Sequence, residues 1–101
     1  MRKKIVVGNW KMYTGLADAQ VLANRIKNGI SDLESIDIVI CPPVPWLASV
    51  AEETHPRPNF FSIGAQDIYY QDEGAYTGAV SAYILRNIIK YAIIGHFVLK
   101  I

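Results

Sequence analysis

The chain has 101 residues, of which 51% are hydrophobic and 19% are charged, a composition that predicts one folded domain rather than intrinsic disorder. Its formal net charge is only +1, so nucleic acid is not an expected partner. A membrane span is not expected either, because no run approaches the roughly 18 apolar residues that a span requires.

The amino terminus and the cysteine content favour a cytoplasmic location. Residues 1–4 are basic, but the apolar run that follows, Ile5–Val7, is far shorter than the apolar region of a secretory signal. Cys41 is the single cysteine, so no intrachain disulfide can form, as is usual in a reducing compartment.

The first half of the chain reads as strand, helix, strand. The run Ile5–Val7 and a loop precede a stretch in which apolar residues recur at spacings of three and four. This stretch, from Leu16 to Ile30, predicts an amphipathic helix. The second run, Ile36–Cys41, stops at Pro42, which lacks the amide donor that a strand needs.

The second half repeats the alternation. Trp46–Thr54 is predicted to be helical, and Phe60–Ile63 forms a third apolar run that enters a polar loop from Gln66 to Gly78. Ser81 is a suitable N-cap for a helix through Lys90, which precedes a fourth run at Ala92–Ile94. The predicted buried side of this last helix consists of Ile84, Leu85, Ile88 and Ile89.

The resulting order, β-α-β-α-β-α-β, predicts a parallel sheet with right-handed crossovers. Periodicity leaves both a flavodoxin-like sheet and a barrel open. Neither a dinucleotide-type glycine-rich turn nor a phosphate-binding P-loop follows the first run.

In either architecture, ligands meet the loops at the carboxyl ends of the strands. Asn9 and Lys11 follow the first run, where they offer an amide donor and a cation to an anionic substrate. His96 follows Gly95 after the fourth run, where an imidazole can donate to a carbonyl oxygen. Taken singly, a solvated lysine and a structural histidine are the simpler interpretations.

Five segments together resemble the triosephosphate isomerase family, in order and at the family's spacing, over residues from about Lys4 to His96. The resemblance implies an α/β fold, a partial TIM (βα)8 barrel of about four parallel strands and three helices. Residues 1–101 would form the amino-terminal part of a single barrel domain. The segments are Gly8-Asn9-Trp10-Lys11-Met12, Cys41-Pro42-Pro43, Gly64-Ala65-Gln66-Asp67, Gly74-Ala75-Tyr76-Thr77-Gly78 and Ile94-Gly95-His96.

The resemblance implies conversion of dihydroxyacetone phosphate to glyceraldehyde 3-phosphate through an enediolate, in glycolysis and gluconeogenesis, without cofactor or metal. Asn9 and Lys11 would bind the triose phosphate, Lys11 would also stabilise the enediolate, and His96 would be the catalytic electrophile. The family's enzyme is itself the standard worked example of this chemistry. Gln66, Tyr76 and Thr77 match the part of the family fold that reaches a neighbouring subunit, which implies a homodimer.

The chain departs from the family after Gly95-His96, where the family continues with serine, glutamate and two arginines. Here Phe97–Ile101 follow instead. A complete barrel takes roughly 250 residues, so we expect a portion truncated after the histidine, inactive alone without the glutamate base and phosphate loops. The alternative is a noncatalytic half-barrel that self-assembles or docks with a complementary chain. The apolar stretch Tyr91–Ile101 is the segment that we expect to pair between molecules.

Overall fold

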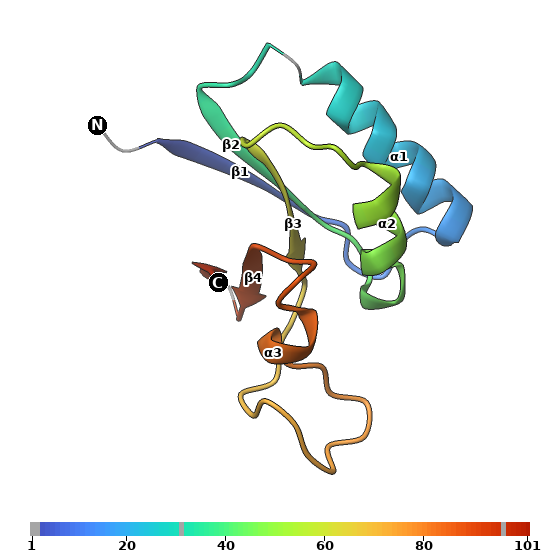
Figure 1. Cartoon of the computed structure of the whole chain (residues 1–101), viewed down its shortest axis with the longest axis vertical. Helices are drawn as coiled ribbons and strands as arrows, with labels where there is room; N and C mark the ends of the chain where they lie inside the picture. The colour runs from blue at the N-terminus through green and yellow to red at the C-terminus, as the bar shows by residue number, and fades with distance from the viewer. Residues whose placement is uncertain (1–2, 31, 96) are drawn as a thin grey trace.

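The computed structural model describes residues 3–30, 32–95 and 97–101. These residues form one five-stranded sheet and three α-helices, with a short 3-10 helix before the second of them (Figure 1). In chain order the elements are β1 (Lys4–Asn9), α1 (Leu16–Gly29), β2 (Ile36–Cys41), η1 (Val44–Trp46), α2 (Leu47–Glu53), β3 (Phe61–Ala65), α3 (Ala82–Leu85), β4 (Tyr91–Ile94) and β5 (Phe97–Lys100).

Each strand pairs with the next strand of the chain, so the order across the sheet is β1-β2-β3-β4-β5. The first four strands are parallel, and the longest register runs from Lys4 opposite Ile36 to Asn9 opposite Cys41. A flavodoxin-like sheet reverses its strand order, whereas a barrel does not. The structure therefore confirms the predicted partial barrel and rejects the flavodoxin-like alternative.

The helices cover one face of this sheet. α1 and α2 lie side by side beside the strands (Figure 1), and α1 turns the fully buried Ala19 and Ala23 inward, where small side chains allow close approach. Alternate residues of β2 and β3 meet the helices, because side chains of a strand point to opposite faces in turn. The strand residues in this core are Ile38, Ile40, Phe61, Ile63, Ala65 and Ala92.

The opposite face carries a second, smaller apolar cluster. Val39, Cys41 and Tyr91 are buried there, with Val7 and Ile93 packed against them. Gly64 allows this packing, because a Cβ at that position would lie 2.8 Å from Cys41 Sγ and 3.0 Å from Val39 Cγ1. Side chains from β1, β2 and β4 thus pack together on the face of the sheet that the helices do not cover.

The third helix is shorter than predicted. Ser81 is the N-cap, as expected, and its Oγ accepts a hydrogen bond from the amide of Ile84 at 3.1 Å. The helix then ends at Leu85 instead of Lys90, because the amide of Ile88 donates to Leu85 O at 2.8 Å and tightens the backbone into a turn. Leu85 and Ile89 are buried as predicted, whereas Ile84 is 55% exposed, so its predicted burial is wrong.

The carboxyl-terminal segment adds a fifth strand that the sequence did not predict. β5 pairs antiparallel with β4, from Ile94 opposite Phe97 to Tyr91 opposite Lys100. The amide of Ile101 continues this pairing by donating to Lys90 O at 2.8 Å. The outer edge of β4 is therefore occupied, and the open edges of the sheet belong to β1 and β5.

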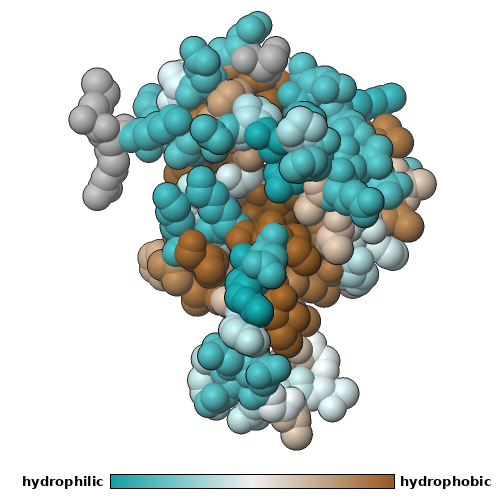
Figure 2. Space-filling view, viewed as in Figure 1, coloured by the Kyte–Doolittle hydropathy of each residue, from teal (hydrophilic) through white to brown (hydrophobic). Residues whose placement is uncertain are grey.

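The side chains of β5 stay on the surface despite the backbone pairing. Phe97 is 79% exposed, and Val98, Leu99 and Ile101 are exposed as well. Figure 2 shows apolar surface between the more hydrophilic upper part of the molecule and the projecting polar loop below. In the part of the chain that is described, no helix is both long and apolar enough to span a membrane.

Candidate active site at the carboxyl edge of the sheet

The side chain of Gln66 ties together the carboxyl ends of the first three strands. Gln66 directly follows β3, and its Nε2 donates to Cys41 O at 2.9 Å and to Lys11 O at 2.7 Å. The amide of Trp10 also donates to Cys41 O, at 3.1 Å. Because a carboxamide nitrogen has two hydrogens, this one group holds the loop after β1 against the end of β2.

Lys11 has a backbone conformation that is uncommon for a residue with a side chain. Its φ is +54°, and its amide donates to Asn9 Oδ1 at 2.9 Å. A non-glycine residue in the left-handed region costs of order 1 kcal/mol and persists only where its surroundings hold it. The side chains of Asn9 and Gln66 hold Lys11 in this conformation. Asn9 Oδ1 accepts from the amide of Lys11, and Gln66 Nε2 donates to its carbonyl oxygen.

The far end of the same loop has its own anchor. Trp46 Nε1 donates to Thr14 O at 3.2 Å, and Thr14 also has a positive φ, of +83°. Met12 and Tyr13, between the two anchors, are exposed. The loop from Lys11 to Thr14 is therefore held at both ends, from η1 and from the residue after β3.

The structure brings together two of the predicted site residues. Asn9 and Lys11 lie at the carboxyl end of β1, and both are exposed at the mouth of the sheet. In the described part of the chain, the one ion pair joins Lys3 to Asp37 at 3.0 Å, so no carboxylate neutralises Lys11. The predicted His96 lies outside the described residues. β4, which precedes it, runs parallel to β1 to β3 and ends at the same edge.

The predicted interface residues lie in or beside a loop that projects from the body of the molecule, between β3 and α3 (Figure 1). Tyr76 and Thr77 are exposed on it. The loop is closed at its base, where the amide of Tyr69 donates to Val80 O at 2.7 Å and Ser81 Oγ donates to Asp72 O at 2.6 Å. The loop is thus ordered by its own hydrogen bonds.

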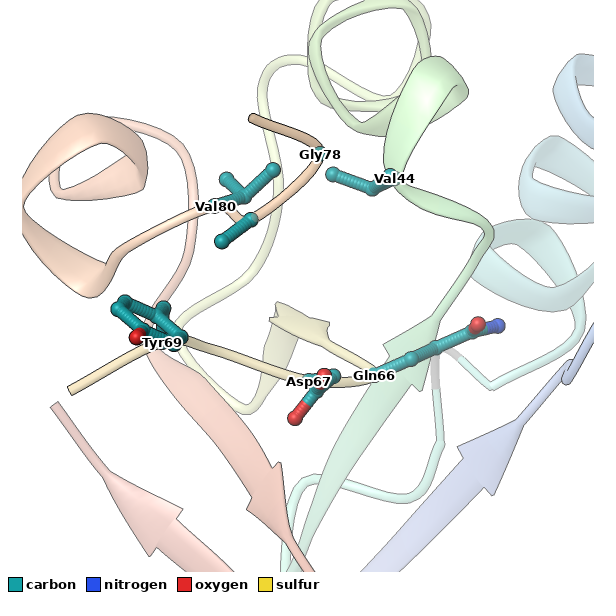
Figure 3. Close-up of a pocket in the computed structure, with 7 residues that line it drawn as sticks. Val44, Gln66, Asp67, Tyr69, Gly78 and Val80 are labelled. Atoms are coloured by element: carbon teal, nitrogen blue, oxygen red, sulfur yellow. The ribbon is translucent and has the colours of Figure 1, made fainter. Parts of the chain in front are cut away.

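A hollow of about 170 Å³ lies between the start of η1 and the base of the projecting loop. Figure 3 shows Val44 directed toward Gly78 across the opening, whereas Gln66 points away from the hollow. This direction agrees with the hydrogen bonds of Gln66 to Lys11 and Cys41. Gln66, predicted as an interface residue, therefore also holds the loop after β1 against the end of β2.

Sequence reasoning missed this role of Gln66, as well as the anchor from Trp46. A signal was present for Gln66, because it directly follows a predicted strand and must lie at the same edge as Asn9 and Lys11. No pattern in the sequence indicated that the indole of Trp46 meets Thr14, 32 residues earlier.

Cys41, at the end of β2, is not a nucleophile. Its side chain is fully buried, and this burial raises the pKa of the thiol to about 11. The thiol is therefore neutral at physiological pH. Cys41 therefore acts as a small buried residue that packs against Val39 and Tyr91.

Comparisons with known proteins agree with this geometry. A family model described as triosephosphate isomerase matches residues 4–97. The triosephosphate isomerase of Dehalococcoides mccartyi is 40% identical over 96 residues, which cover 95% of this chain and 37% of that protein. That of Xanthomonas oryzae pv. oryzae is 41% identical over 97 residues, or 95% of this chain and 38% of that protein.

A solved structure gives the same result. The crystal structure of triosephosphate isomerase from Bartonella henselae superposes with a TM-score of 0.82 at 30% identity, covering 94% of this chain and 38% of that one. The chain therefore spans a little over a third of the length of the proteins that it matches.

The strained backbone of Lys11 predicts that replacement by glycine leaves the chain more stable than replacement by alanine, the reverse of the usual order. Replacement by glycine usually leaves a protein less stable than replacement by alanine, because glycine loses more backbone entropy on folding. At a φ of +54° the steric cost falls on alanine, so we expect Lys11→Gly to be more stable than Lys11→Ala by about 1 kcal/mol. Urea unfolding monitored by tryptophan fluorescence measures the difference. An alanine variant that is the more stable of the two would show that the backbone is unstrained.

The raised pKa of Cys41 predicts slow alkylation of the folded chain. The folded thiol ionises near pH 11, so at pH 8 the thiolate fraction is at least about a hundredfold lower than in the unfolded chain. Iodoacetamide at pH 8 should modify the chain at least about a hundredfold faster in guanidinium chloride than in buffer. Mass spectrometry follows the added mass, and similar rates in both conditions would refute the buried neutral thiol.

Proposed function

The chain belongs to the triosephosphate isomerase family, and from this premise we propose that it is the amino-terminal part of an isomerase that interconverts dihydroxyacetone phosphate and glyceraldehyde 3-phosphate. The observation that carries the proposal is the position of Lys11. Its cation lies at the carboxyl edge of a parallel sheet, and Asn9 and Gln66 hold its backbone in a strained conformation. Strained residues held by several partners are characteristic of catalytic sites.

In the proposed reaction, Lys11 binds the substrate phosphate and stabilises the negative charge of the enediolate. A cation fixed before the reaction lowers the barrier more than mobile water does, because it needs no reorganisation when the charge develops. Asn9 fixes the amide of Lys11 and helps to bind the substrate. His96, which follows β4 in the sequence, would donate a hydrogen bond to the substrate carbonyl.

The remaining groups of such a reaction are expected on strands beyond this chain's match to its relatives. The relatives are more than twice as long as the chain, which covers 37% of the Dehalococcoides mccartyi protein. We propose that residues 1–101 alone are nearly inactive, because the base and the phosphate loops are expected in the part of the relatives that this chain does not match. We propose that this reaction belongs to glycolysis and gluconeogenesis and takes place in the cytoplasm.

We also propose that the projecting loop, residues 66–80, forms a homodimer contact. Tyr76 and Thr77 are exposed on a loop that its own hydrogen bonds order, so little conformational entropy is lost when a second subunit binds it. The second candidate function is a noncatalytic half-barrel that self-assembles through β5 or docks with a complementary chain. The exposed apolar side chains of β5, with Phe97 at 79%, favour this alternative.

Complementation tests the catalytic proposal. The chain is mixed with a fragment that carries the rest of the Dehalococcoides mccartyi protein, and isomerase turnover is measured in a coupled assay. We expect activity only in the mixture, reduced at least about a hundredfold by Lys11→Ala because the charge on the enediolate is then unbalanced. Lys27→Ala, on α1, is the control that should leave the activity unchanged.

Two results would contradict the catalytic proposal. Turnover by the chain alone within about tenfold of 10 per second would show that the missing strands are not needed. Full activity of Lys11→Ala in the mixture would remove Lys11 from the mechanism. An inactive mixture that nevertheless forms a stable complex would favour the noncatalytic half-barrel.

Sedimentation separates the two modes of association. We expect the chain to form dimers that Thr77→Arg weakens at least tenfold, because an arginine in the loop introduces a bulky charge into the contact. Phe97→Asp is the matched control on the exposed face of β5. Dissociation by Phe97→Asp alone would assign assembly to β5, and a monodisperse monomer of 11.3 kDa would contradict both modes.

A further inference from the structure

A second hollow lies at the opposite end of the sheet from Asn9 and Lys11. Its volume is about 380 Å³, which falls within the range of small-molecule sites. The walls are residues 55–59, 61–63 and 86–90, which are the connection from α2 to β3, the start of β3 and the connection from α3 to β4. β3 spans about 17 Å, so this hollow is separate from the candidate active site.

The hollow is lined by cations without carboxylates. Arg57, Arg86 and Lys90 line it, together with His55, and no aspartate or glutamate is among the lining residues. Over residues 3–30, 32–95 and 97–101, the single ion pair is that of Lys3 with Asp37, so none of the three cations has a carboxylate partner within 4.0 Å. Three residues with a formal positive charge therefore line one hollow in a chain whose net charge is only +1.

Arg57 is held in place before any ligand arrives. Its Nη1 donates to Ala51 O at 2.7 Å and to Thr54 Oγ1 at 3.2 Å, at the carboxyl end of α2. A guanidinium has five N–H groups, so those on Nε and Nη2 remain for another acceptor. Burial lowers the pKa of Arg57, which means that the cation has lost part of its hydration and that a bound anion would restore the lost interaction.

Arg86 is fixed in a similar way from the other wall. Its Nη1 donates to Tyr83 O at 2.7 Å, and its guanidinium carbon lies 4.0 Å from the centre of the Tyr83 ring. Two preoriented guanidinium groups lose little side-chain entropy when they bind an oxyanion, and each can bind two oxygens at once. Lys90 is exposed and adds a mobile third cation.

From this arrangement we propose that the hollow between the α2–β3 and α3–β4 connections binds a phosphate dianion, free or as a small phosphate ester, through Arg57, Arg86 and Lys90. The planar guanidinium groups match the paired oxygens of phosphate. An extended polyanion does not fit, because the cations gather in one hollow and do not form a stripe along the surface. The site does not depend on the proposed isomerase activity.

NMR titration of the full chain with inorganic phosphate, at constant ionic strength, tests this site. We expect the amide signals of Asn59 and Asn87 and the Nε–H signals of Arg57 and Arg86 to shift with a single dissociation constant. Arg86→Gln should raise that constant at least tenfold, and Arg57→Lys, which keeps the charge but loses the planar fork, should also raise it. Lys27→Gln changes the net charge as much as Arg86→Gln does, but on α1, and should change the constant less than twofold.

A second titration identifies the source of the phosphate. Tighter binding of glycerol 2-phosphate than of inorganic phosphate would indicate an ester, and equal or weaker binding would indicate the free ion. Shifts confined to the loop after β1 and abolished by Lys11→Gln would overturn the site and support the candidate active site instead. Absence of any shift, or equal effects of Arg86→Gln and Lys27→Gln, would overturn it as well.

Discussion

Parallel pairing in strict chain order is the constraint on which the rest of the structure depends. Parallel strands need a crossover, and the crossover is right-handed, so a sheet whose order never reverses places every helix on the same face. That face buries Ala19, Ala23 and the outward residues of β2 and β3. The other face is left to the smaller cluster around Val39 and Tyr91. The same constraint brings the carboxyl ends of β1, β2 and β3 to one edge, which is why a single carboxamide, that of Gln66, reaches both Lys11 and Cys41.

The one antiparallel strand has a different role from the others. In a complete parallel barrel, the outer edge of β4 would pair with the next parallel strand. Here β5 takes that edge from Tyr91 to Ile94, and the amide of Ile101 extends the pairing to Lys90. Because the edge of a strand offers one set of amides and carbonyls, a complementary chain can dock on β4 in the parallel sense only after β5 has left. A complementary chain would therefore compete with β5 for the edge of β4. Phe97 is exposed, so side-chain packing contributes little to holding β5 in place.

Local patterns predicted what local forces determine. The apolar runs gave four strands near their observed positions, the spacing of apolar residues gave α1 over Leu16–Gly29, and Ser81 was recognised as an N-cap. Features that depend on distant partners were not predictable. After α3 ends at Leu85, the chain turns and the amide of Lys90 donates to Ile63 O of β3 at 2.8 Å, and β5 pairs with the open edge of β4. In the site, the left-handed conformation of Lys11 has no signature in its own residue type, since a glycine or asparagine is the usual sign of it.

The cationic residues at the two ends of the sheet are held in different ways. At the carboxyl end, Lys11 is a single exposed charge whose backbone carries the strain. Its geometry depends on Asn9, the last residue of β1, and on Gln66, which directly follows β3. At the amino end, Arg57 and Arg86 follow α2 and α3, and these preceding helices hold them through Ala51 O and Tyr83 O. A disturbance of strand pairing therefore reaches Lys11 directly, whereas it reaches the two arginines only when α2 or α3 moves. The carboxyl-end site requires the assembled sheet, and the amino-end hollow requires chiefly the short connections that return each helix to the next strand.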